Sequence, residues 1–197
     1  MPNYLSDLPK LAEYVEFVES SGNPNAVSYS GAVGLMGIKP MTAAGPGSGV
    51  TALRPAELYD PDKNRKFGEE YLAKMLNYYK GNAGYAILGY GWGMGNTDKW
   101  LKSGADINKL PPDKRNYMEG FSGTGVHADE FKKAKANGWT RYHAQNRAPA
   151  KPNPEAVAEI NSLYSEGPSG QGIGAQQAVN REQAWSKANE FLDKSKP

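Results

Sequence analysis

Hydrophobic side chains recur at helical spacing in the first part of the chain and become sparse after Phe121. The first such pattern predicts a short helix from about Leu8 to Ser20, because at about 100° per residue its apolar positions share one arc. These positions are Leu8, Leu11, Val15 and Val18. The run 20–24 (Ser-Ser-Gly-Asn-Pro) contains residues that end helices, so a loop is expected next.

One acidic residue, Glu19, lies inside this apolar arc. It follows Val15 by four residues, whereas Glu13 and Glu16 point to the other side of the helix. A carboxyl group on the apolar side of a helix loses hydration, which raises its pKa, and no other acid of the chain has such a setting. At a helix end beside a Gly-rich loop, this acid is a candidate general acid. The alternative is that Glu19 lies at the edge of the arc and turns into solvent.

Further helices are predicted from end signals and apolar rows. The second helix begins at Asp60-Pro61, with Asp60 as N-cap and Pro61 in the first turn, and its apolar row continues to about Lys80. An Ala-rich apolar stretch predicts a third helix over 83–90. Two short helices are expected over 98–102 and 112–121. The predicted fold class is therefore mainly α.

Two Gly-rich segments interrupt these helices. Residues 22–49 enclose an apolar run at 33–38, which is typical of an ordered loop or short strands over a cleft. Residues 91–96 carry alternate glycines that let the backbone come close to another group. Their spacing matches neither the dinucleotide fingerprint nor the P-loop, and they follow a helix rather than a strand, which argues against a phosphate site.

Composition divides the chain into two parts. Hydrophobic residues make up 39% of the 197 residues, so one core cannot extend through the whole length. Residues 122–197 contain seven Ile, Leu, Val or Met side chains, too few for an independent core. We predict a helical domain over 1–121 and a core-poor tail over 122–197. The tail stays extended, lies on the helical domain or docks on partner proteins, and docking on partners is the interpretation that we favour. The tail has spacers at 148–154 and 166–174 and amphipathic segments at 155–164 and 181–194.

Charge and residue types exclude several functions. The net charge of +2, with no cluster of Lys and Arg among aromatic residues, does not indicate nucleic-acid binding, although it suits an anionic polymer such as a cell wall. The chain has no cysteine, and His127 and His143 lack ligand spacing. We therefore expect no metal site and no cofactor, and both histidines on the solvated surface. No stretch reaches the length of a transmembrane helix, and the N-terminus has no signal-peptide pattern.

A series of short motifs runs in order along the first part of the chain. It comprises Glu19-Ser20, Gly22-Asn23-Pro24, Ala26-Val27-Ser28, the segment 31–36 (Gly-Ala-Val-Gly-Leu-Met), Pro40, Thr42, Asp60-Pro61, Asn64, Gly68, Tyr71-Leu72, Tyr90, Gly93 and Arg115-Asn116-Tyr117. With this series, residues 11–121 resemble the catalytic domain of the soluble lytic transglycosylases, a goose-lysozyme-like family that cleaves bacterial peptidoglycan. The resemblance implies a lysozyme-like helical domain with a catalytic cleft.

The resemblance also implies roles for the matching residues. Glu19 would protonate the glycosidic oxygen between N-acetylmuramic acid and N-acetylglucosamine, and would then take a proton from the muramyl 6-hydroxyl, which closes a 1,6-anhydro ring without water. Tyr117 resembles the tyrosine that holds this glutamate. The sugar cleft would be lined by Ser28, Leu35, Met36 and Tyr90. The alternative for both tyrosines, Leu35 and Met36 is a packing role in the core.

The chain departs from the family pattern at three places. Gly37 replaces a glutamine, Gly91-Trp92 replaces Asn-Ala, and Asp113-Lys114 replaces Glu-Thr. Trp92 is either a platform for a sugar ring or a buried lid residue. The missing amide side chains leave three interpretations open: a lytic transglycosylase, a virion subunit that keeps the fold as a structural or glycan-binding module, and an ordinary hydrolase.

An enzyme that cuts the cell wall without a signal peptide needs a carrier. A phage particle that delivers it during genome entry would meet this need, and so would a secretion apparatus that assembles through the wall. The long core-poor tail favours a virion component, made in the host cytoplasm and packed against other subunits.

Overall fold

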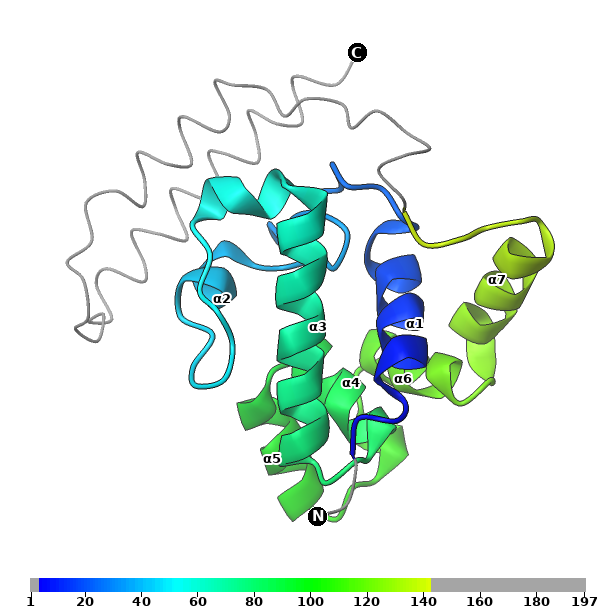
Figure 1. Cartoon of the computed structure of the whole chain (residues 1–197). Coiled ribbons are helices and arrows are strands. Elements are labelled where there is room, and N and C mark those ends of the chain that lie inside the picture. Colours follow the sequence, from blue (N-terminus) through cyan, green and yellow to red (C-terminus); the bar gives the residue numbers. More distant parts are fainter. Residues whose placement is uncertain (1–3, 143–197) are drawn as a thin grey trace.

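Seven α-helices and two 3₁₀ helices follow one another in the computed structural model, which describes residues 4–142. The α-helices are α1 (Leu8–Ser20), α2 (Pro40–Ala44), α3 (Pro61–Tyr78), α4 (Ala83–Gly91), α5 (Met94–Lys102), α6 (Pro112–Phe121) and α7 (Gly125–Ala136), and the 3₁₀ helices are η1 (Pro55–Tyr59) and η2 (Ile107–Lys109). Helix α3 packs on α1 and α4, and α6 contacts both α4 and α7 (Figure 1). The mainly α fold class is confirmed for the described residues.

Local signals explain where these helices begin and end. The Asp60 side chain caps α3 by accepting hydrogen bonds from the backbone N–H groups of Asp62 and Lys63, at 3.0 and 3.1 Å. Helix α1 stops at Ser21, which has a left-handed φ of 52°. The predicted bounds of α1, α3, α4 and α6 are confirmed to within two residues, whereas α5 begins at Met94 instead of Asp98. None of the described helices combines the length and hydrophobicity needed to cross a membrane.

A buried asparagine orders the loop between α1 and α3. Asn64 on α3 is fully buried, and its Nδ2 donates to the carbonyl oxygens of Val33 and Leu58, both at 2.9 Å. Its Oδ1 accepts the backbone N–H of Met36 at 2.8 Å. Residues 27–38 form two isolated β-bridges rather than strands, and α2, which the pattern did not predict, follows them. The expected ordered loop therefore owes its shape to side-chain hydrogen bonds from α3.

The packed part of the chain continues past the boundary predicted at residue 121. Helix α7 packs on α6 and α1, and Tyr142 beyond it is buried. The rings of Phe131 and Trp139 lie 5.1 and 5.3 Å from that of Phe17. The start of the predicted tail therefore lies on the helical domain, and counting aliphatic residues misses this contact because the segment packs through aromatic ones. The remainder of the predicted tail lies outside the described residues: His143, the two spacers and the two amphipathic segments.

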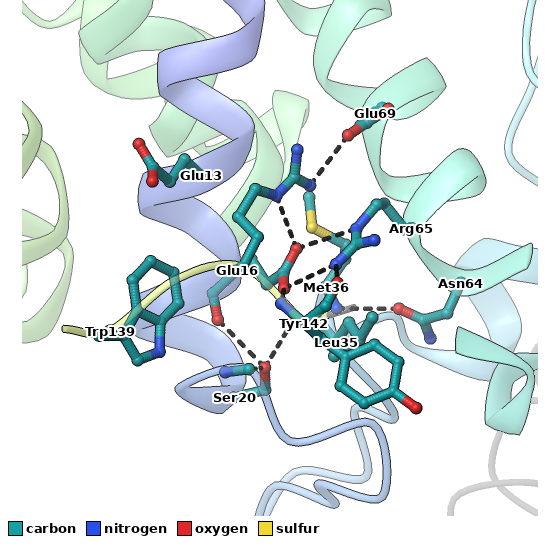
Figure 2. Close-up of polar contacts among 12 residues, drawn as sticks. Glu13, Glu16, Ser20, Leu35, Met36, Asn64, Arg65, Glu69, Trp139 and Tyr142 are labelled. Atoms are coloured by element: carbon teal, nitrogen blue, oxygen red, sulfur yellow. Dashed lines mark hydrogen bonds and ion pairs between the residues drawn. The ribbon is translucent and has the colours of Figure 1, made fainter. Parts of the chain in front are cut away.

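Glu16 on α1 is fully buried, and both of its carboxylate oxygens are paired (Figure 2). Arg65 donates to Oε1 and Oε2 at 2.9 and 3.1 Å, and Arg141 donates to Oε2 at 2.8 Å. The Tyr142 N–H donates to Oε1 at 2.8 Å, and its carbonyl accepts from Arg65 at 2.6 Å. We call these four residues the Glu16 clamp. The expectation that Glu19 alone among the acids is poorly hydrated is therefore wrong.

Candidate active site

A cavity of about 420 Å³ opens where the end of α1 meets the 28–42 loop, the end of α4, the start of α6 and α7. Its volume falls in the range of ligand pockets, roughly 300–1,000 Å³. Five of the predicted site residues line it: Glu19, Ser28, Tyr90, Trp92 and Tyr117. The structure thus brings together residues that lie up to 98 positions apart in the chain.

Leu35 and Met36 do not line the cavity. Both side chains are fully buried, and Met36 packs against Gly68 of α3, where a Cβ would lie 2.6 Å from the Met36 Cβ. The hydrogen bond from the Met36 N–H to Asn64 draws this turn onto α3. Of the two interpretations of Leu35 and Met36, the structure therefore supports core packing, and their expected place in the sugar cleft is corrected.

Glu19 lies in the last turn of α1 and on the wall of this cavity, where its side chain is half-buried. The Tyr117 hydroxyl donates a hydrogen bond to its Oε1 at 2.8 Å. Burial raises the pKa of Glu19 to about 7, although the hydrogen bond from Tyr117 and the charges of Lys114 and His127 act in the opposite direction. A large fraction of Glu19 is therefore protonated near neutral pH, and a carboxyl group with such a pKa can both donate a proton and take one back.

Tyr117 is fixed by contacts on its backbone as well as on its ring. Its carbonyl accepts a hydrogen bond from the Tyr14 hydroxyl at 2.9 Å, and the two rings lie 6.0 Å apart. Burial, together with the charge of Glu19, raises the pKa of Tyr117 well above its ordinary value. The hydroxyl therefore stays protonated and continues to donate to Glu19. This contact matches the positioning role that the resemblance implied.

Two departures from the family pattern make room for this pair. Gly37 has a φ of +58°, and a Cβ there would meet Oε2 and Cδ of Glu19, the latter at 2.8 Å. A Cβ at Gly91 would lie 2.5 Å from Cε1 of Tyr117. A real Cβ does not approach other atoms this closely, so neither position accepts a side chain unless the pair moves. Close packing of Glu19 and Tyr117 explains both glycines.

Tyr90 and Trp92 both line the cavity and pack against other parts of the fold, so each combines the two roles that the sequence left open. The Tyr90 hydroxyl donates to the Met36 carbonyl at 2.6 Å, so it ties α4 to the loop while its ring lines the cavity. Trp92 is half-buried at the end of α4. Its ring lines the cavity and also packs against a small apolar cluster formed by Leu88, Trp100 and Leu110.

Sequence reasoning missed the contribution of α7 to the cavity wall. His127, expected on the solvated surface, lines the cavity and lies 3.1 Å from Oε2 of Glu130 through its Nδ1. No local pattern identifies this role, because it depends on how α7 packs on α6. Asp113 and Lys114 also line the wall and form an ion pair at 3.0 Å. Within residues 4–142, no three His, Asp or Glu side chains gather closely enough to hold a metal ion.

The arrangement suits proton transfer to a bound ligand. One carboxyl group with a pKa near neutrality faces the cavity, and a tyrosine hydroxyl fixes its position. Asp113 is a second carboxylate on the wall, but its side chain is 68% exposed and paired with Lys114. The two acids therefore have different environments, and Glu19 is the candidate proton donor.

The fold and the site together define a class of protein. It is a helical domain whose cleft carries one poorly hydrated acid at the end of the first helix. The family model described as "Transglycosylase SLT domain" matches residues 5–110, more than half of the chain. The chain therefore belongs to this family, and the predicted resemblance is confirmed. Helix α7 and the Glu16 clamp residues Arg141 and Tyr142 lie beyond the matched segment.

Several curated proteins are similar to part of the chain. The transglycosylase of Enterobacteria phage PRD1 is 39% identical over 103 residues, 52% of this chain and 34% of that protein. Membrane-bound lytic murein transglycosylase E of Buchnera aphidicola is 46% identical over 71 residues, 32% of this chain and 31% of that protein. An endo-type membrane-bound lytic murein transglycosylase A of Klebsiella pneumoniae is 38% identical over 78 residues, 35% and 36% of the two chains. The matches thus span about a third of each relative, and no solved structure matches the chain.

Proposed function

We propose that this chain is a lytic transglycosylase that cleaves the β-1,4 bond between N-acetylmuramic acid and N-acetylglucosamine in peptidoglycan. The observation that carries the proposal is Glu19, which faces the cavity with a pKa of about 7 and a hydrogen bond from Tyr117. The family membership and the names of the relatives from phage PRD1, Buchnera and Klebsiella support it.

The proposed reaction needs one carboxyl group in two protonation states. Protonated Glu19 donates its proton to the glycosidic oxygen, and the bond between that oxygen and muramyl C1 breaks. The muramyl 6-hydroxyl then attacks C1 and gives its proton to the Glu19 carboxylate, which restores the acid and closes the 1,6-anhydro ring. The Tyr117 hydroxyl stabilises the carboxylate between the two transfers. Water is neither consumed nor released.

The products distinguish this reaction from hydrolysis. Digestion of purified murein is expected to release muropeptides that are lighter by one water than those of a hydrolase, because their muramyl ends are anhydro rings. Mass spectrometry of the soluble fraction measures this difference, with a commercial muramidase digest as the reference. Reducing ends instead of anhydro ends would contradict the transglycosylase and favour a hydrolase in which Asp113 activates water.

Activity is expected to depend on pH through Glu19. The acid form is needed for the first proton transfer, so the rate should be half-maximal at about pH 7 and fall as pH rises further. Turbidity loss of murein suspensions across a pH series measures this fall in rate on the alkaline side of the pH profile. Lys114→Ala provides the control. It removes a positive charge that lowers the pKa of Glu19, so the fall in rate should move to higher pH. A rate that stays flat across neutral pH would rule out Glu19 as the donor.

We also propose that the chain is a phage virion component that acts on the cell wall during genome entry. The similarity to the phage PRD1 transglycosylase supports a phage association. Subunit contacts through the tail are part of the proposal. The alternative is a virion subunit that binds glycan without cleaving it. Mass spectrometry of purified particles tests the location, and particles that never contain the chain would refute it.

A further inference from the structure

Tyr29 is a completely exposed aromatic residue in a turn next to the cavity. Its relative exposure is 104%, the highest of the large hydrophobic side chains in residues 4–142. Its two neighbours in the chain, Ser28 and Ser30, both line the cavity. A tyrosine ring gains free energy when its apolar surface is covered. The turn beside the cavity therefore carries an uncovered aromatic ring, which a ligand that extends beyond the cavity can cover.

The turn that carries this ring is held by its own hydrogen bonds. The Gly31 N–H donates to the Ser28 carbonyl at 2.9 Å, and the Ser28 N–H donates to the Ala32 carbonyl at 2.8 Å. The Ala32 N–H also donates to the Ser28 Oγ at 2.9 Å. An isolated bridge between Val27 and Val33 closes the base of the turn. The tip is thus ordered before any ligand arrives, which lowers the entropic cost of binding there.

A glycan strand is longer than the cavity, so part of a bound strand must lie outside it. About 420 Å³ accommodates a small part of a glycan strand, and the remaining sugars must leave over the rim. The C–H faces of pyranose rings are apolar, and an aromatic ring covers such a face well. Inside the cavity, Tyr90 and Trp92 already offer aromatic rings on the wall formed by the end of α4. Tyr29 would extend this aromatic lining to a different element of the fold.

We propose that Tyr29 is a sugar-stacking platform outside the cavity, which makes the chain bind long N-acetylhexosamine strands more tightly than short fragments. The substrate class in this inference rests on the proposed function, whereas the exposure of Tyr29 and its place between two cavity-lining residues do not. Tyr29 touches the strand away from the scissile bond, so it acts on affinity and length preference and leaves the proton transfers to Glu19.

Binding of N-acetylglucosamine oligomers tests this inference without catalysis. In the Glu19→Gln background, Tyr29→Ala is expected to weaken hexasaccharide binding by about five- to tenfold and to leave disaccharide binding unchanged, measured by calorimetry. Tyr29→Phe should retain the affinity, because the ring is kept. Tyr78→Ala is the matched control, since Tyr78 is 50% exposed on α3 and is not part of the cavity wall.

The outcomes separate this inference from the proposed function. Equal affinity of Tyr29→Ala and its parent for the hexasaccharide would overturn the inference, as would an equal loss for both oligomers. An absence of binding by every oligomer would also overturn it. If the parent binds in a length-dependent manner through Tyr29 but the wild-type chain releases nothing from murein, the inference stands and the proposed reaction fails.

Discussion

Glu19→Gln is expected to remove murein cleavage while leaving the fold intact. The amide has nearly the same shape, and its oxygen can still accept the hydrogen bond from Tyr117. It cannot donate an acidic proton to the glycosidic oxygen, so we expect the rate to fall by about 10²–10⁴-fold, the usual contribution of a general acid. Zymography on purified murein and turbidity loss measure this effect. Thermal unfolding should show no loss of stability, because the substitution replaces a poorly hydrated carboxyl group with a neutral one.

Two further variants help to interpret the result for Glu19→Gln. Tyr117→Phe removes the hydrogen bond to Glu19 and should lower the rate less than Glu19→Gln does, because the acid itself remains. Asp113→Asn should keep most of the activity, since the proposed reaction uses one carboxyl group. Equal inactivation by Asp113→Asn and Glu19→Gln would indicate a two-carboxylate hydrolase. Full activity of Glu19→Gln would place the proton donor elsewhere.

The parts of the fold that the sequence predicted are those set by local chemistry. The arc of α1, the Asp60 cap and the proline that opens α6 each act over one helical turn, and the structure has all three helices in their expected places. Glu19 was found for the same reason, because four residues of spacing suffice to place it beside Val15. The contact from Tyr117 lies 98 residues away, and it was reached through the family resemblance instead of periodicity.

The parts that the sequence could not predict depend on contacts between distant elements. Helical spacing places Glu16 opposite the apolar arc of α1. Whether this face of α1 is exposed to solvent depends on α3 and on the segment after α7. Leu35 and Met36 likewise became core residues because Asn64 holds their turn. His127 lies on the cavity wall through the packing of α7 on α6. Each of these outcomes is a property of the assembled fold.

Gly37 and Gly91 show the same limit of sequence-based prediction in the active site. From the sequence they indicate lost hydrogen-bonding groups, since the family pattern has amide side chains there. In the structure they are points of close approach, where a Cβ at Gly37 would meet Glu19 and one at Gly91 would meet Tyr117. An altered residue in a family motif therefore does not identify a lost function until its neighbours are known.

Glu16→Gln is expected to lower the free energy of unfolding by about 3–5 kcal/mol, because it leaves two guanidinium groups without their buried anion. Arg65 and Arg141 are 19% and 22% exposed, so residual contact with water places the cost toward the lower end of that range. The clamp joins α1, α3 and Tyr142, and its loss should also free the segment after α7. Denaturant unfolding measures the first effect, and hydrogen exchange at the Tyr142 amide measures the second.

Glu13→Gln supplies the matched comparison for this prediction. Glu13 lies on the same helix and also pairs with a cation beyond α6, Lys135, at 2.6 Å, but the two side chains are 29% and 43% exposed. A pair in contact with solvent contributes about 0–1 kcal/mol, so Glu13→Gln should cost far less than Glu16→Gln. Similar costs for the two variants would show that the clamp is no stronger than a surface ion pair. In that case the packing of Phe17, Phe131 and Trp139, together with the hydrogen bond from the Trp139 Nε1–H to the Ser21 carbonyl at 2.9 Å, would hold the end of the described chain on α1.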